Sequence, residues 1–104
     1  MKPVNTATIE FLSRSSNEGF ARTAAACFAA QLDPTLEEIN DIKTAVSEAV
    51  TNAIVHAYPD SIGQVVVKVR ICPDQVLEVT VRNVPEQAGK VLRAAGLERL
   101  LRFE

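Results

Sequence analysis

The fold is decided by residues 35–57, which read TLEEINDIKTAVSEAVTNAIVHA. Thr35 followed by Glu38 matches a capping box, in which the Thr35 hydroxyl accepts from the Glu38 amide and the Glu38 side chain reaches back. Apolar residues then recur at spacings of three and four, which places them on one helix face. The pattern predicts a long helix from Thr35 to about Ala57, ended by Tyr58-Pro59-Asp60. Its core-facing residues would be Ile39, Ile42, Val46, Ala49, Val50, Ala53 and Ile54.

A strand and a shorter helix are expected before this segment. Asn5 to Leu12 mixes Thr, Ile and Phe, which favours a strand. Ser15-Ser16-Asn17-Glu18 offers N-cap residues and an acid for a first turn. Apolar residues at nearly helical spacing follow, and Asp33-Pro34 breaks the pattern. They are Phe20, Ala24, Cys27, Phe28 and Leu32.

Two half-buried strands are expected after the long helix. From Gln64 to Cys72, Val65, Val67, Val69 and Ile71 alternate with Gln64, Val66, Lys68 and Arg70. Val76 to Arg82 alternates in the same way, with Leu77, Val79 and Val81 on one side, and Pro73-Asp74-Gln75 supplies a turn. The pattern predicts an antiparallel hairpin with a helix layer on one face. We expect Val46, Val50, Ile54, Val67, Val69, Leu77 and Val79 to form one core with Phe20 and Phe28.

A third helix is expected after Asn83-Val84-Pro85, because Ala88, Val91, Leu92 and Ala95 fit a helical period. The predicted fold class is therefore α/β (α+β). Its architecture is a two-layer β-α-α-β-β-α sandwich with a mainly antiparallel sheet.

Composition excludes several classes of function. The 104 residues are 47% hydrophobic and 23% charged with a net charge of -2, which gives no general attraction to nucleic acid or anionic membranes. No apolar run approaches the roughly 20 residues of a membrane helix, and no signal segment begins the chain, so a cytoplasmic location is expected. Cys27 and Cys72 are expected to be buried reduced thiols. With His56 as the single histidine, a zinc site is not expected.

The opposite face of the long helix is polar, with Thr44, Glu48, Asn52 and His56 recurring every fourth residue. A carboxylate and a carboxamide one turn apart suit Mg²⁺ held together with phosphates and waters. The carboxylate could also polarise an attacking hydroxyl group. A plain solvated helix surface is the alternative from spacing alone.

The strings Gln31 to Thr35 and Ile42 to Tyr58, with Ser16 to Arg22 upstream, closely resemble the anti-sigma F factors of spore-forming bacteria. These are serine kinases of the GHKL ATPase superfamily. The resemblance runs from about Ile9 to Arg82. It implies that Glu48 is the catalytic base, that Asn52 is the Mg²⁺ ligand, and that Arg22 contacts both the sigma factor and the anti-anti-sigma factor. His56 ends the motif, where a cap favoured by the helix dipole explains it equally well.

The sequence departs from the family pattern after the last predicted strand. Where the family has Asp-x-Gly-x-Gly, this chain has Asn83, Pro85 and Gln87. Asn83 still offers a carbonyl acceptor for an adenine amino group, but Pro85 cannot adopt the positive φ available to glycine. The four glycines form no phosphate-binding loop. We therefore expect a truncated GHKL-like half with an incomplete nucleotide pocket and no bound cofactor, whereas the family uses ATP and Mg²⁺.

Residues 84–104 resemble the C-terminal helix and strand of STAS domains, the fold of the anti-anti-sigma factor. Any leucine-rich closing helix would give a similar pattern. The expected division is therefore 1–83, GHKL-like, and 84–104, STAS-like, which would make the chain a natural or engineered chimera.

Three functions remain open at this point. One is a regulatory protein that acts by binding a sigma factor and an anti-anti-sigma factor, without turnover. The second is a working ATP-dependent serine kinase that inhibits a sporulation sigma factor, and the third is a fragment chimera with no activity. The missing nucleotide segments weigh toward the first, and open sheet edges favour a homodimer or higher oligomer.

Overall fold

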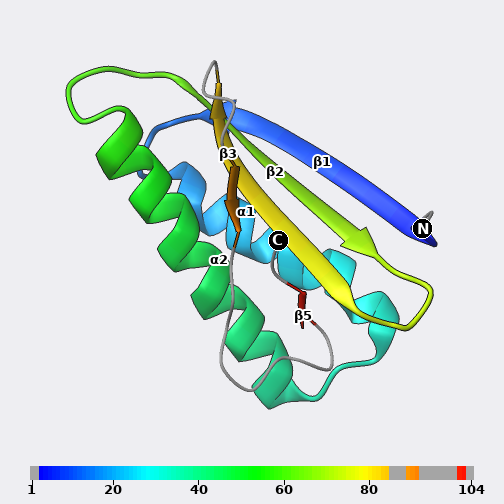
Figure 1. Ribbon diagram of the computed structural model, residues 1–104. Coiled ribbons are helices and arrows are strands. Elements are labelled where there is room, and N and C mark those ends of the chain that lie inside the picture. The colour runs from blue at the N-terminus through cyan, green and yellow to red at the C-terminus, as the bar shows by residue number, and fades with distance from the viewer. Residues whose placement is uncertain (1–2, 85–88, 92–100, 103–104) are drawn as a thin grey trace.

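The computed structural model describes residues 3–84, 89–91 and 101–102. Two helices lie side by side on one face of an antiparallel sheet (Figure 1). The fold class and the two-layer arrangement predicted from the sequence are confirmed. The main elements are β1 (Asn5–Leu12), α1 (Asn17–Ala29), α2 (Leu36–Ala57), β2 (Gln64–Ile71) and β3 (Leu77–Val84).

Strand β2 lies between β1 and β3, and both pair with it antiparallel. Asn5 lies opposite Ile71 in the first pairing, and Ile71 lies opposite Leu77 in the second. The turn between β2 and β3 has Gln75 in the left-handed region at a φ of 62°. The predicted hairpin is confirmed, with its second strand extended to Val84.

Helix α2 begins as predicted. The Glu38 amide donates to the Thr35 hydroxyl at 3.1 Å, and the Thr35 amide donates to the Glu38 carboxylate at 2.9 Å. Helix α1 continues into a short 3₁₀ turn (η1, Ala30–Leu32), and Asp33 then adopts a left-handed φ of 51°. The Asp33-Pro34 break therefore separates two helices that can fold back against each other.

The core lies between α2 and the inward-facing residues of the sheet. Ile42, Val46 and Val50 are fully buried, and so are Leu77 and Val81. Ile54 and Phe28 are partly buried against this cluster.

Two residues differ from expectation. Phe20 is 53% exposed and only meets the edge of the Phe11 ring, with centroids 6.3 Å apart. Cys27 is exposed, whereas Cys72 is buried. The buried face of α1 is formed by Ala21, Ala25, Ala26 and Ala29. The apolar stripe predicted for α1 therefore does not coincide with the helix face that packs in the core.

The third helix is not found at Gly89–Val91, which forms a short strand, β4. This strand pairs antiparallel with residues 80–82, and β5 (Leu101–Arg102) pairs parallel with Leu77 and Glu78. The outer edge of β3 offers unpaired backbone groups, and strand pairing satisfies them where a helix would not. The rest of the predicted helix and most of the STAS-like segment lie outside the described residues.

Candidate functional site between α1 and α2

The polar face of α2 is exposed as predicted. Thr44, Glu48, Asn52 and His56 all lie on the solvent side of the helix, while Val46 and Val50 on its other side are completely buried. The helical period alone produces this division, because residues four apart share a face. The motif residues are therefore available to bind something from outside the core.

A pocket of about 420 Å³ lies where α1 meets α2. It is lined by Arg22, Asn40, Lys43, Thr44, Ser47 and Glu48. A second hollow of about 300 Å³ follows along α2, lined by Ser47, Glu48, Thr51 and Asn52. Ser47 and Glu48 line both hollows, so together they form one polar surface. The structure thus brings Arg22, Glu48 and Asn52 to the same region of the molecule.

Glu18 organises the α1 side of this surface. Its carboxylate accepts two hydrogen bonds from Nη1 of Arg22, at 2.7 and 3.0 Å. The Ser47 hydroxyl, which donates to Glu18, and the Arg22 guanidinium hold the pKa of the Glu18 carboxyl below its ordinary value of 4.5, although burial opposes them. Glu18 therefore connects α1 to α2 and fixes the position of Arg22. The sequence analysis missed this role, although the i,i+4 spacing of Glu18 and Arg22 was a visible signal.

Asn83 lies apart from these hollows. Leu77, Val79 and Val81 face the helix layer, and Asn83 continues the same row at the end of β3. Its side chain is buried, and its Oδ1 atom has no hydrogen-bond partner among the residues that the structure describes. A buried acceptor without a donor is costly, so this oxygen is suited to receive an N–H group from a ligand.

The described residues fit a nucleotide and its metal ion only in part. Glu48 and Asn52 offer oxygen ligands for Mg²⁺, which normally keeps several waters and phosphate oxygens as well. Within the described part of the chain, no group of three His, Cys, Asp or Glu residues could hold a metal ion. Asn83 offers one acceptor for an amino group. Pro85 and Gln87 lie outside the described residues.

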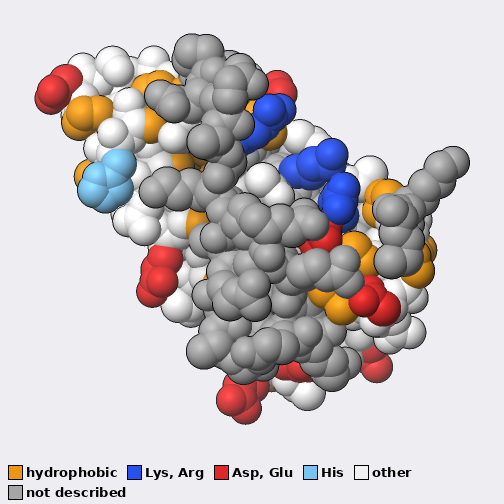
Figure 2. All heavy atoms as spheres, in the orientation of Figure 1, with side chains coloured by type: hydrophobic (Ala, Val, Ile, Leu, Met, Phe, Trp, Pro, Cys, Tyr) orange, Lys and Arg blue, Asp and Glu red, His pale blue; other side chains and the backbone are white. Residues whose placement is uncertain are grey.

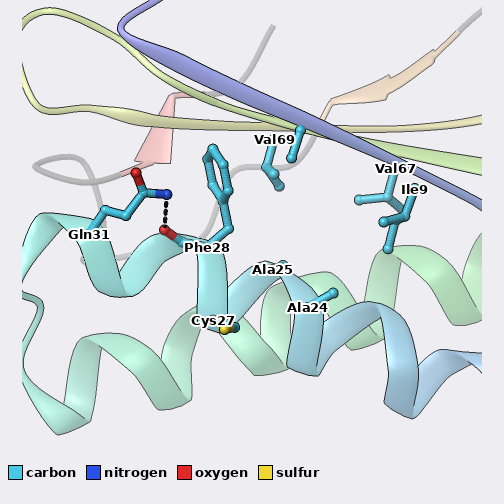
Figure 3. A pocket seen from close by; sticks show the side chains of 9 residues that line it. Ile9, Ala24, Ala25, Cys27, Phe28, Gln31, Val67 and Val69 are labelled. Atoms are coloured by element: carbon cyan, nitrogen blue, oxygen red, sulfur yellow. Dashed lines mark hydrogen bonds between the residues drawn. The ribbon is translucent and has the colours of Figure 1, made fainter.

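An apolar cavity of about 420 Å³ lies elsewhere, between α1 and the β1–β2 side of the sheet. Figure 3 shows Ala24 and Ala25 below Ile9, Val67 and Val69, with the Phe28 ring at one end. The small side chains of α1 leave this space open. Gln31 closes the same end, where its Nε2 donates to the Phe28 carbonyl at 2.9 Å. The apolar spacing along α1 gave no sign of this cavity, because it depends on how far the helix lies from the sheet.

Residues 13–98 match the family model of the histidine kinase-like ATPase domain. The chain belongs to this family. The match confirms the superfamily to which the sequence was compared. It also continues past residue 83, where the sequence predicted a domain boundary. That boundary stays a prediction.

Anti-sigma F factors are among the similar proteins. This histidine kinase-like ATPase domain is 52% identical over 89 residues to the one from Thermoanaerobacter sp. (strain X514), covering 86% of this chain and 60% of the relative. It is 59% identical over 73 residues to that of Clostridium beijerinckii (strain ATCC 51743 / NCIMB 8052), covering 69% of this chain and 51% of the relative. The chain thus spans somewhat more than half the length of these relatives.

In the described part of the chain, no helix is both long and apolar enough to span a membrane.

Proposed function

We propose that this chain is an anti-sigma-factor-like regulatory protein that acts by binding other proteins, with an incomplete nucleotide pocket. Its partners would be a sigma factor and an anti-anti-sigma factor, bound through α1 and the adjoining polar surface. The identity to anti-sigma F factors over most of this chain supports the assignment.

The observation that carries the proposal is the geometry of Arg22. Its side chain is 43% exposed, yet the Glu18 carboxylate holds its guanidinium in place. An arginine that is positioned before binding loses less conformational freedom in an interface, and arginine is enriched among the residues that dominate binding energy. Arg22 also lines the pocket that contains Glu48. A partner that contacts Arg22 would therefore cover the polar surface of α2.

An ATP-dependent serine kinase that phosphorylates an anti-anti-sigma factor is the second candidate. The exposed Glu48 and Asn52 favour it, and so does the unpartnered Oδ1 of Asn83. In that case Glu48 would take the proton from the substrate hydroxyl, while Asn52 would help to hold the Mg²⁺ ion that neutralises phosphate charge. Asn83-Val84-Pro85-Glu86-Gln87, in place of Asp-x-Gly-x-Gly, weighs against this function. A fragment chimera without activity is a further alternative, based on the STAS-like residues 84–104.

Calorimetric titration with a sigma F-type sigma factor tests the proposal. The unchanged chain should bind it, and Arg22→Ala should weaken binding at least about tenfold, a change that interface arginines commonly produce. Arg14→Ala is the matched control, because Arg14 is exposed in the loop before α1 and does not line the pocket. Absence of binding by the unchanged chain, or equal weakening by both variants, would contradict the proposal.

A further inference from the structure

The sheet has a second face that α1 and α2 do not cover. Val65, Val67 and Val69 of β2 point toward the helices, so Val66, Lys68 and Arg70 point the other way. A hollow of about 390 Å³ lies on this open face. Its described lining residues are Thr8, Val66, Lys68, Arg70, Thr80 and Arg82. Figure 2 shows Lys and Arg side chains gathered in a row over the sheet, although the whole chain has a net charge of -2.

One of the three cations is neutralised within the fold. Arg70 donates from Nε to the Glu78 carboxylate at 2.8 Å and also from Nη2, and Glu78 is buried. Lys68 and Arg82 have no ion-pair partner among the described residues. Glu10 lies on the same face, but it accepts from Gln64 at 3.2 Å and is not part of the lining. In the part of the chain that the structure describes, Lys68 and Arg82 therefore share the hollow without an ion-pair partner, and Glu10, diagonal to Lys68 across β1, is the nearest carboxylate on the β1 side.

The strand register places hydrogen-bond donors around Lys68. Lys68 lies opposite Thr8 on one side and Thr80 on the other. Arg82 lies opposite Val66, which makes it the diagonal neighbour of Lys68. Diagonal cross-strand neighbours are within reach of long side chains, so two cations here repel each other unless an anion lies between them. The Thr8 and Thr80 hydroxyls can add two further donors.

We propose that this hollow binds the phosphate group of a small phosphate monoester. A phosphate dianion matches the charge of Lys68 and Arg82, and its oxygens accept from several donors at once. The volume of about 390 Å³ lies in the range of small-molecule sites, which leaves room for the carbon part of the ester beside the phosphate group. The hollow opens on the side of the sheet opposite the α1–α2 surface. It is therefore a site separate from the one in the proposed function.

The test is a titration of the full chain, followed by backbone amide NMR shifts, with inorganic phosphate and with glycerol 3-phosphate as probes. Both should give saturating shifts at Lys68, Thr80 and Arg82. Lys68→Gln and Arg82→Gln should each weaken binding about tenfold, as expected for the loss of a charge-assisted contact. Arg14→Gln removes the same charge from an exposed loop outside the hollow, and should leave binding within about twofold.

Three results would overturn the proposal. Equal weakening by all three variants would show only a general effect of charge. Shifts confined to Glu48 and Asn52 would place the phosphate on the other side of the sheet. Tighter binding of a hexaglutamate peptide than of glycerol 3-phosphate, with shifts at Lys68 and Arg82, would show that the face docks an acidic protein segment.

Discussion

Arg22 of α1 and Glu48 of α2 line the same pocket, although they come from different helices. Glu18 supports this arrangement, because its carboxylate binds Arg22 and hydrogen bonding with Ser47 of the neighbouring helix lowers its pKa. The residue expected to contact partners and the residue expected to act as a base therefore lie on one continuous surface. Any partner held by Arg22 would change the access of solvent to Glu48.

The first prediction concerns Glu48 and Asn52. Both side chains are exposed, so Glu48→Ala and Asn52→Ala should each change the free energy of unfolding by less than about 1 kcal/mol. Alanine is also a better helix former than asparagine, which offsets any lost contact at position 52. Urea unfolding measures the effect. A loss of several kcal/mol would mean that these residues are structural and not part of a binding surface.

The second prediction concerns acid stability. Because the pKa of Glu18 is lowered in the folded state, its ionised form stabilises the fold above the ordinary value of 4.5. That contribution is lost as the pH falls through the lowered pKa. Glu18→Gln should therefore show a smaller loss of unfolding free energy between neutral pH and the acid range below 4.5 than the unchanged chain.

Asp60→Asn is the control for acid stability, since Asp60 lies exposed in the loop after α2. It should leave the pH dependence close to that of the unchanged chain. If Glu18→Gln and Asp60→Asn gave the same pH profile, the link from Arg22 through Glu18 to Ser47 would be without energetic effect.

The third prediction concerns the core under α2. Val50 is completely buried, so Val50→Ala should cost about 1–3 kcal/mol through lost burial and the cavity it leaves. Val55→Ala on the same helix is the matched control, because Val55 is 53% exposed. Its effect should stay within about 0.5 kcal/mol in the same denaturation experiment. Equal losses of unfolding free energy in the two variants would contradict the observed orientation of α2, with Val50 inside and Val55 outside.

The long elements could be predicted from the sequence because their periods are strong and local. Helix α2 has a capping box and an unbroken apolar stripe, and β1 was predicted with its observed bounds, Asn5–Leu12. The rotation of α1 about its axis could not be predicted, because an alanine-rich helix has little difference in hydrophobicity between its faces. Phe20 and Cys27 were consequently placed on the wrong side.

The candidate site could be predicted only as separate residues. The shared helix face of Glu48 and Asn52 can be predicted from the helical period. Their proximity to Arg22 cannot, because it depends on how α1 packs against α2. The pairing of Gly89–Val91 with β3 likewise depends on tertiary structure, which local sequence patterns do not encode. Helical periodicity in that segment was outweighed by the open edge of the sheet.

The fourth prediction concerns assembly. In the described part of the chain, β1 pairs only with β2, which leaves its outer row of backbone groups unpaired beside the apolar cavity at α1. We predict a homodimer or a larger symmetric oligomer with an interface above about 1,000 Å². Light scattering at low micromolar concentration should give a multiple of the 11.3 kDa chain mass. A clean monomer mass would contradict the prediction.

The measurement that tests the central claim most directly is calorimetric titration of the chain with ATP in the presence of Mg²⁺. Glu48 and Asn52 would supply only the metal corner of a nucleotide site, and Asn83 would supply one uncharged acceptor. We therefore predict a dissociation constant in the millimolar range or weaker, equivalent to about -4 kcal/mol or less favourable. A micromolar dissociation constant would contradict a regulator with an incomplete pocket, and would favour the serine kinase instead.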